Sequence, residues 1–194
     1  MSKRMTALLP RPPLLMTESR EHFDQVRNSL EREIQPRGTI EQMYVHDMAY
    51  IVWEIRRLRR CKDTIINVAF RTGLERVLQQ LLRRPSDSWA DRWEIEGLAL
   101  RWFTDPKAKK EVTELLQEFE LDEVAIEAEA IRECSQSLEQ LDRMLRSLEA
   151  RRDRTLALVT EYRVNLAHQL RGSAERMLQD SNVRRLDNNA KKTA

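Results

Sequence analysis

The apolar residues between positions 122 and 180 recur in two runs at alternating steps of three and four, with a gap between them. The first run is Ile131, Cys134, Leu138, Leu141, Leu145 and Leu148, and the second is Val159, Tyr162 and Leu166. This spacing places a narrow apolar seam along a helix that packs against another helix. No glycine or proline interrupts the chain from Lys107 to Arg171. We therefore expect one long helix over residues 122–180.

A second apolar stripe, between residues 40 and 82, has the spacing of a helix with one buried face. It contains Met48, Ile51, Ile55, Leu58, Ile65, Ile66, Ala69, Leu74, Val77, Leu78, Leu81 and Leu82. Thr39 and Gln42 match a capping box, in which two side chains bind the first amides of a helix. The pattern predicts a helix over 40–82, with a bend at Gly73, because glycine is costly inside a helix.

Three shorter patterns predict further helices over residues 17–35, 88–103 and 106–119. No run of alternating apolar and polar residues indicates a strand. The sequence thus predicts an all-α fold, an elongated antiparallel helical hairpin or coiled-coil-like bundle with a small Trp-rich helical cap. We expect a single helical domain over 17–180. A flexible Pro-containing arm over residues 1–16 precedes it, and a disordered tail over 181–194 follows.

The two long predicted helices differ in length. At ~1.5 Å per residue, residues 40–82 span ~64 Å and residues 122–180 span ~87 Å, so the last helix overshoots its partner by ~20 Å. The overshoot is apolar, because the seam extends to Leu166 and Leu170. Its cover is either other helices of this chain or a second copy, and we favour a symmetric homodimer through the long helices.

Charged residues interrupt both apolar stripes, at Lys62 in the first and at Arg152 in the last. Unpaired charges on a packing face are costly, so each needs a carboxylate or access to water. Antiparallel pairing with Ile66 opposite Leu138 creates two polar layers that fix the register. These layers pair Lys62 with Asp142 and Arg152 with Glu54. The alternative is that the seam opens, or the long helix kinks, near Arg152.

Composition and charge fit long, solvated helices. Hydrophobic residues make up 41% of the chain and charged residues 34%, which is too apolar for disorder and highly charged for a globule. The net charge is +2, but residues 111–133 hold nine acidic residues and one basic residue. This acidic segment is either a solvated helix face or is drawn to a basic surface on this chain or a partner.

The sequence lacks the residue patterns of several kinds of chemistry. His22, His46 and His168 have no metal-ligand spacing. The four glycines are isolated, so no phosphate-binding loop is predicted. We expect no cofactor, no metal site and no enzyme activity. Cys61 and Cys134 indicate free thiols in a reducing compartment. The absence of a signal peptide or a long apolar run favours a cytoplasmic location without a membrane partner.

Two groups of residues are candidates for binding. Arginines cluster on both long helices and could contact phosphates of a nucleic acid, or form ion pairs within their own helices. These residues are Arg56, Arg57, Arg59, Arg60, Arg151, Arg152 and Arg154. The aromatic residues of the cap are either a partner contact or the core of the cap. They are Trp89, Trp93, Trp102 and Phe103.

Three stretches carry a resemblance to known proteins. They are Leu141-Asp142-Arg143-Met144-Leu145, Glu149-Ala150-Arg151-Arg152-Asp153 and Glu161-Tyr162-Arg163. This run resembles the C-terminal helix of a group of alphaproteobacterial helical proteins. The stretch Val52-Trp53-Glu54-Ile55-Arg56-Arg57-Leu58-Arg59-Arg60 is similar to an Arg-rich helix of that group. The resemblance implies a bacterial protein in which both Arg-rich stretches belong to one core. No activity is assigned to the group, so it implies no function.

These patterns together favour a non-enzymatic protein-interaction or scaffold module that acts through long helix surfaces and self-associates. The alternative is a nucleic-acid-associated accessory protein that uses the basic bands on the two long helices.

Overall fold

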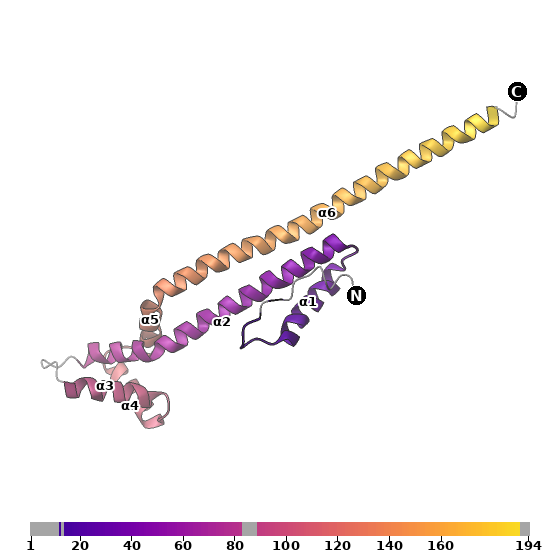
Figure 1. Ribbon diagram of the computed structural model, residues 1–194. Coiled ribbons are helices and arrows are strands. Elements are labelled where there is room, and N and C mark those ends of the chain that lie inside the picture. The colour runs from indigo at the N-terminus through magenta and orange to yellow at the C-terminus, as the bar shows by residue number, and fades with distance from the viewer. Residues whose placement is uncertain (1–11, 13, 83–88, 191–194) are drawn as a thin grey trace. The chain divides into compact units, whose positions relative to one another are not determined.

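Every regular element in the described part of the chain is an α-helix, so the predicted all-α class is confirmed. The computed structural model describes residues 12, 14–82 and 89–190, and the side chains of residues 12, 14–82 and 93–179. The helices are α1 (Arg20–Ile34), α2 (Thr39–Leu81), α3 (Trp89–Trp102), α4 (Pro106–Glu118), α5 (Glu123–Glu133) and α6 (Ser135–Ala190) (Figure 1).

The chain divides into two compact units, where the sequence predicts a single domain over 17–180. Unit 1 comprises residues 1–53 and 148–194, and unit 2 comprises residues 54–147. Both α2 and α6 contribute a part to each unit. An ion pair joins α2 to α6 in each: Glu41 with Arg163 in unit 1, and Lys62 with Asp142 in unit 2. These ion pairs show that α2 lies beside α6 in each unit.

Unit 1 is built around Phe23 of α1, which is fully buried. Its ring packs edge-on against Tyr50 and Trp53 of α2, with ring centroids 6.1 Å and 5.7 Å away. Leu14 also packs against this cluster. Most of the predicted arm over residues 1–16 lies outside the described residues, but Leu14 is thus a packed residue.

The helix starts in unit 1 differ from those predicted. A turn at residues 15–18 delays α1, and Ser19 caps it by accepting a hydrogen bond from the amide of His22 (3.4 Å). The predicted capping box of Thr39 and Gln42 is wrong, because α2 already begins at Thr39. Glu41 instead reaches back and accepts from the amide of Arg37 (2.8 Å).

Unit 2 has a core shared by four helices. Leu74 and Leu78 of α2, Val112 of α4 and Ile126 of α5 are fully buried, and Ala99 of α3 packs with them. Each helix places one apolar face inward. Because those faces converge, the positions of α3 and α4 are fixed by the same core.

Gly73 of α2 lies where α5 crosses it. A Cβ atom at this position would stand 2.8 Å from the amide nitrogen of Ala130 and 2.9 Å from the carbonyl oxygen of Ile126. Glycine therefore permits a close backbone approach here, and it does not end α2. The guanidinium of Arg76, one turn further on, pairs with Glu129 (3.5 Å) and with Glu133.

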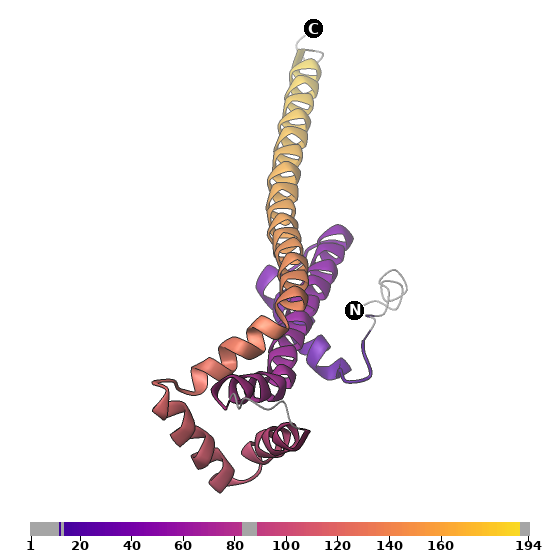
Figure 2. The same ribbon diagram turned by 90° about the vertical axis from the view of Figure 1, so that its left-hand side faces the viewer.

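The single long helix predicted over 122–180 is wrong, because Cys134 separates α5 from α6. Figure 2 shows α5 turning away from the line of α6. The turn lets Ile126 and Ala130 face α2 at Gly73, so Ile131 of the predicted seam is left exposed. At its other end α6 continues to Ala190, so residues 181–190 of the predicted tail are helical. Residues 191–194 lie outside the described part.

Candidate partner-binding groove

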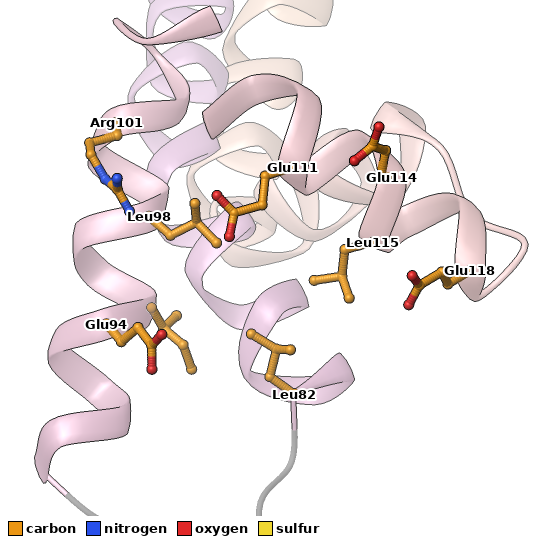
Figure 3. Close-up of a pocket in the computed structure, with 9 residues that line it drawn as sticks. Leu82, Glu94, Leu98, Arg101, Glu111, Glu114, Leu115 and Glu118 are labelled. Carbon is orange, nitrogen blue, oxygen red and sulfur yellow. The ribbon is translucent and has the colours of Figure 1, made fainter. Parts of the chain in front are cut away.

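A groove of about 350 Å³ lies in unit 2 between α3, α4 and the end of α2 (Figure 3). Its lining combines apolar and charged side chains: Leu82, Glu94, Ile95, Leu98, Arg101, Glu111, Glu114, Leu115 and Glu118. We define the four apolar residues as the floor and the five charged residues as the rim. This volume is at the lower end of the range for ligand pockets.

The floor belongs to the core of unit 2. Ile95 and Leu98, three residues apart on α3, are buried in that core, and Leu82 and Leu115 are packed against it. In Figure 3 the side chains of Leu98, Leu115 and Leu82 point into the space between the helices. The floor is therefore an apolar surface held in place by the packing beneath it.

The rim is acidic and open to solvent. Glu111, Glu114 and Glu118 follow one face of α4 at helical spacing, and Glu94 lies across the groove on α3. Arg101 is the one basic residue of the lining, and its Nε donates to the carbonyl of Gly97 (3.4 Å). All five side chains are exposed. Four carboxylates and one guanidinium leave the rim with an excess of negative charge.

The acidic segment over 111–133 divides into two parts with different surroundings. Its later part is drawn to a basic residue of this chain, since Glu129 and Glu133 bind Arg76 of α2. The hydrogen bond from Arg132 lowers the pKa of Glu129 below its ordinary value, with a smaller contribution from Arg76. Of its earlier part, Glu111, Glu114 and Glu118 lie on the rim, and Glu114 also pairs with the exposed Lys110 at 3.5 Å. The spacing of the rim glutamates was visible in the sequence, but their apolar neighbours across the groove were not.

The aromatic residues predicted as partner contacts have different environments. Trp102 is half-buried against the core, packs edge-on to Phe103 (centroids 4.9 Å apart) and lies under the ammonium of Lys109 (5.0 Å). Trp93 and Phe103 are exposed, and the side chain of Trp89 lies outside the described residues. Of the described aromatics of α3 and its end, none lines the groove. Partner contact by Trp93 and Phe103 stays a prediction.

The predicted contact between Lys62 and Asp142 is present, with Nζ and Oδ1 2.8 Å apart. Both side chains are partly exposed, and whether the pair sets the register stays a prediction. Arg152 binds its neighbour Asp153, with Nε and Oδ1 2.9 Å apart. Glu54 and Arg152 belong to different units, so their pairing also stays a prediction.

The arginine clusters fall in different units, Arg56, Arg57, Arg59 and Arg60 in unit 2 and Arg151, Arg152 and Arg154 in unit 1. Each of the four in unit 2 already interacts with another residue. Arg57 and Arg152 are half-buried, and the other five are exposed. A single basic band formed by both clusters stays a prediction.

An ion pair between the buried Glu41 and the partly exposed Arg163, which the sequence patterns did not indicate, joins three segments of unit 1. Glu41 is only 2% exposed, and its two oxygens accept from Nε and Nη2 of Arg163, each at 3.0 Å. The same Nη2 donates to the carbonyl of Ile34 at the end of α1 (2.6 Å). The hydrogen bond from Arg163, followed by that from the Arg37 amide, lowers the pKa of Glu41. The pair therefore holds α1, α2 and α6 together.

Comparison of the chain with protein-family models, with curated proteins and with solved structures finds no match. The resemblance to alphaproteobacterial helical proteins thus stays a prediction. Within the described residues, no group of three or more His, Cys, Asp and Glu side chains is placed to hold a metal ion. Nor is any described helix long and apolar enough to cross a membrane. The groove is the feature from which a function can be argued.

Proposed function

We propose that this protein is a non-enzymatic interaction module that binds a basic, amphipathic segment of a partner protein in the groove of unit 2. The observation that carries this proposal is the apolar floor bordered by exposed carboxylates on both α3 and α4. Such a surface complements a helix or extended segment that has Leu-like residues on one face and Lys or Arg beside them.

The floor supplies the affinity. Burying each methylene of a partner side chain against it contributes ~0.8 kcal/mol. A volume of about 350 Å³ accepts a few aliphatic side chains, as small docking sites do. Because Ile95 and Leu98 are fixed by the core, little conformational freedom is lost there on binding.

The rim supplies the choice of partner. Exposed pairs between carboxylates and Lys or Arg are worth ~0.2–1 kcal/mol each and are weakened by salt. Their larger effect is to speed association with basic segments and to disfavour acidic ones. The same charge disfavours the phosphates of a nucleic acid at this site.

Clustered carboxylates also serve acid–base catalysis, but the rim lacks the setting which that chemistry needs. A catalytic carboxyl group is tuned by burial or by a close charged partner. Glu94, Glu111, Glu114 and Glu118 are all exposed. This arrangement supports binding over catalysis.

The nucleic-acid role remains the alternative. It rests on the exposed arginines, such as Arg59 in unit 2 and Arg151 in unit 1. An electrophoretic mobility shift at two salt concentrations tests it, because phosphate contacts weaken steeply with salt. Absence of a shift at the lower salt concentration removes this alternative.

Fluorescence anisotropy of a labelled helical peptide tests the groove. The peptide carries Leu at heptad spacing with Lys beside it, and a second peptide carries Glu in place of Lys. We expect the Lys peptide to bind more tightly, and Glu111→Gln with Glu118→Gln to weaken its affinity by about two- to thirtyfold.

The matched control is Glu120→Gln with Glu127→Gln, two exposed acids of the same unit that lie outside the groove lining. This control removes the same charge and should leave the affinity within about twofold. Equal binding of the two peptides, or an equal loss in the control, contradicts the proposal.

A further inference from the structure

The end of α6 extends beyond the helices that accompany it in unit 1. Arg163 binds Glu41 near the start of α2, and it also donates to the carbonyls of Ile34 and Gln35 at the end of α1. From there α6 continues to Ala190, a further ~40 Å at ~1.5 Å per residue. Figures 1 and 2 both show this stretch with no other helix of unit 1 beside it. We call residues 164–190 the overhang.

The packing face of α6 continues onto the overhang. Val159, just before Arg163, is 3% exposed, whereas Leu166, Leu170 and Met177 are 39%, 63% and 74% exposed. At ~100° per residue these four side chains lie within ~20° of one line along the helix. A face that is buried while α1 and α2 are present is therefore left open where they end.

A helix of this kind gains little stability from its own sequence. Isolated helices are marginal in water, and most helix stability in proteins comes from packing of an apolar face. The overhang also contains Gly172, and glycine is less favourable than alanine in a helix interior. We therefore expect its apolar stripe to pack against another helix.

We propose that a second copy of this chain covers the overhang, as an antiparallel helix pair related by a two-fold axis between Ser173 and Ala174. This axis places Leu170 opposite Met177 of the second copy, and Met177 opposite its Leu170. A two-fold interface must present the same surface from both copies, with each contact repeated.

The residues around the axis suit a close approach. Ser173 and Ala174 are small, so the two backbones can come together at the crossing point. Arg171 and Arg176 lie ~100–120° from the stripe, on opposite flanks of the helix. The two-fold pair therefore does not place Arg171 of one copy against Arg176 of the other. The face also continues the seam with which α6 packs within its own chain. That continuity favours a helix of the same pattern as the occupant.

Sedimentation equilibrium of the full chain tests the proposal, with Leu170→Glu and Met177→Glu combined in one variant. Each substitution occurs twice in a two-fold dimer, so we expect the dimer dissociation constant to rise by about a hundredfold or more. The matched control is Leu158→Glu with Val164→Glu. These are two exposed apolar residues of α6 that lie off the stripe, and the control should remain dimeric.

Cysteine cross-linking tests the register. Leu170→Cys and Met177→Cys are made separately in chains carrying Cys61→Ser and Cys134→Ser, and the two are then mixed. Antiparallel pairing predicts a disulfide between the two different variants and little within either alone. A chain that is monomeric at all concentrations, a dimer that survives the double substitution, or cross-links only between identical variants each overturns the proposal.

This inference does not depend on the groove. The groove lies in unit 2 and the overhang in unit 1. Binding of the Lys peptide by the monomeric Leu170→Glu/Met177→Glu variant separates failure of one proposal from failure of the other.

Discussion

Glu41→Gln tests the ion pair that joins α1, α2 and α6 in unit 1. The substitution keeps the size of the side chain but removes its charge. Glu41 accepts three hydrogen bonds, from Nε and Nη2 of Arg163 and from the amide of Arg37. A neutral amide retains at most part of this set, because its nitrogen cannot accept a hydrogen bond.

The expected loss of stability depends on the burial of Glu41 and on the partial exposure of Arg163. A hydrogen bond to a charged group contributes ~1.5–3 kcal/mol in net terms. Arg163 is 41% exposed, so water screens part of the interaction. We expect Glu41→Gln to lower the free energy of unfolding by ~1–3 kcal/mol at neutral pH.

Arg163→Met should cost more, ~2–4 kcal/mol, because it leaves a buried carboxylate without its charged partner. It also removes the donor to the carbonyl of Ile34. The two effects should not add. The double variant should be more stable than their sum predicts by ~1 kcal/mol or more, since each single change already breaks the shared contact.

The effect of Glu41 depends on pH in a defined direction. Arg163, and then the Arg37 amide, hold the pKa of Glu41 in the folded protein below its ordinary value of 4.5. Its contribution is therefore complete above pH 4.5 and is lost as the pH falls through the lower, folded pKa. The difference between wild type and Glu41→Gln should shrink over that interval.

Urea denaturation followed by circular dichroism measures these differences at neutral and acidic pH. Glu139→Gln is the control, because Glu139 forms an exposed pair with Arg143 at 3.1 Å, and it should change stability by less than ~0.5 kcal/mol. If Glu41→Gln is as stable as wild type at neutral pH, or if the difference does not shrink on acidification, the assigned role of the pair is refuted.

Four further substitutions have outcomes set by local geometry, each measured by urea denaturation. Gly73→Ala should destabilise by ~1–3 kcal/mol, because its Cβ would meet the backbone of Ala130 at 2.8 Å. Gly97→Ala, whose Cβ meets nothing within 4 Å, should stabilise by up to ~1 kcal/mol, and loss at both sites contradicts the close approach. Asp105→Ala should cost ~0.5–2 kcal/mol, because Asp105 caps α4 through the amide of Lys107 at 2.9 Å. Lys62→Leu should cost less than ~1 kcal/mol, because its pair with Asp142 is partly exposed, and a larger loss supports a polar layer that sets the register.

Local signals in the sequence located most helices, since proline, glycine and capping residues act within a few positions. Asp105 with Pro106, for example, correctly placed the start of α4. The antiparallel register also predicted the contact between Lys62 and Asp142, because a repeating seam fixes which residues face each other. These inferences use only spacing along one or two helices.

The break at Cys134 could not be predicted in this way. Ile126, Ala130, Cys134 and Leu138 keep helical spacing through it, and no glycine or proline marks it. The cause lies elsewhere in the chain, at Gly73, where the absent side chain lets α5 cross α2. The contact between Arg163 and Glu41 was not predictable either, because the two residues are far apart in the sequence and no local pattern links them.

The groove was predictable in part. The sequence shows the acidic residues of α4 but does not decide whether they are solvated or drawn to a basic surface. The structure assigns Glu129 to Arg76 and leaves Glu111 on the rim. The floor arises only when the end of α2 packs with α3 and α4, so it has no signature in any single helix.

Arg163 also marks the point on α6 beyond which α1 and α2 no longer cover its apolar seam. A guanidinium has donors but no acceptor, and here it satisfies both Glu41 and the end of α1. No further turn of α2 exists to pair with Leu166, because α2 begins at Thr39. Neither α1 nor α2 can therefore cover the overhang, and the proposed two-fold pair through it would give each assembly two grooves. A bivalent partner would then bind more tightly to the dimer than to the Leu170→Glu/Met177→Glu variant, while a single peptide would bind both equally.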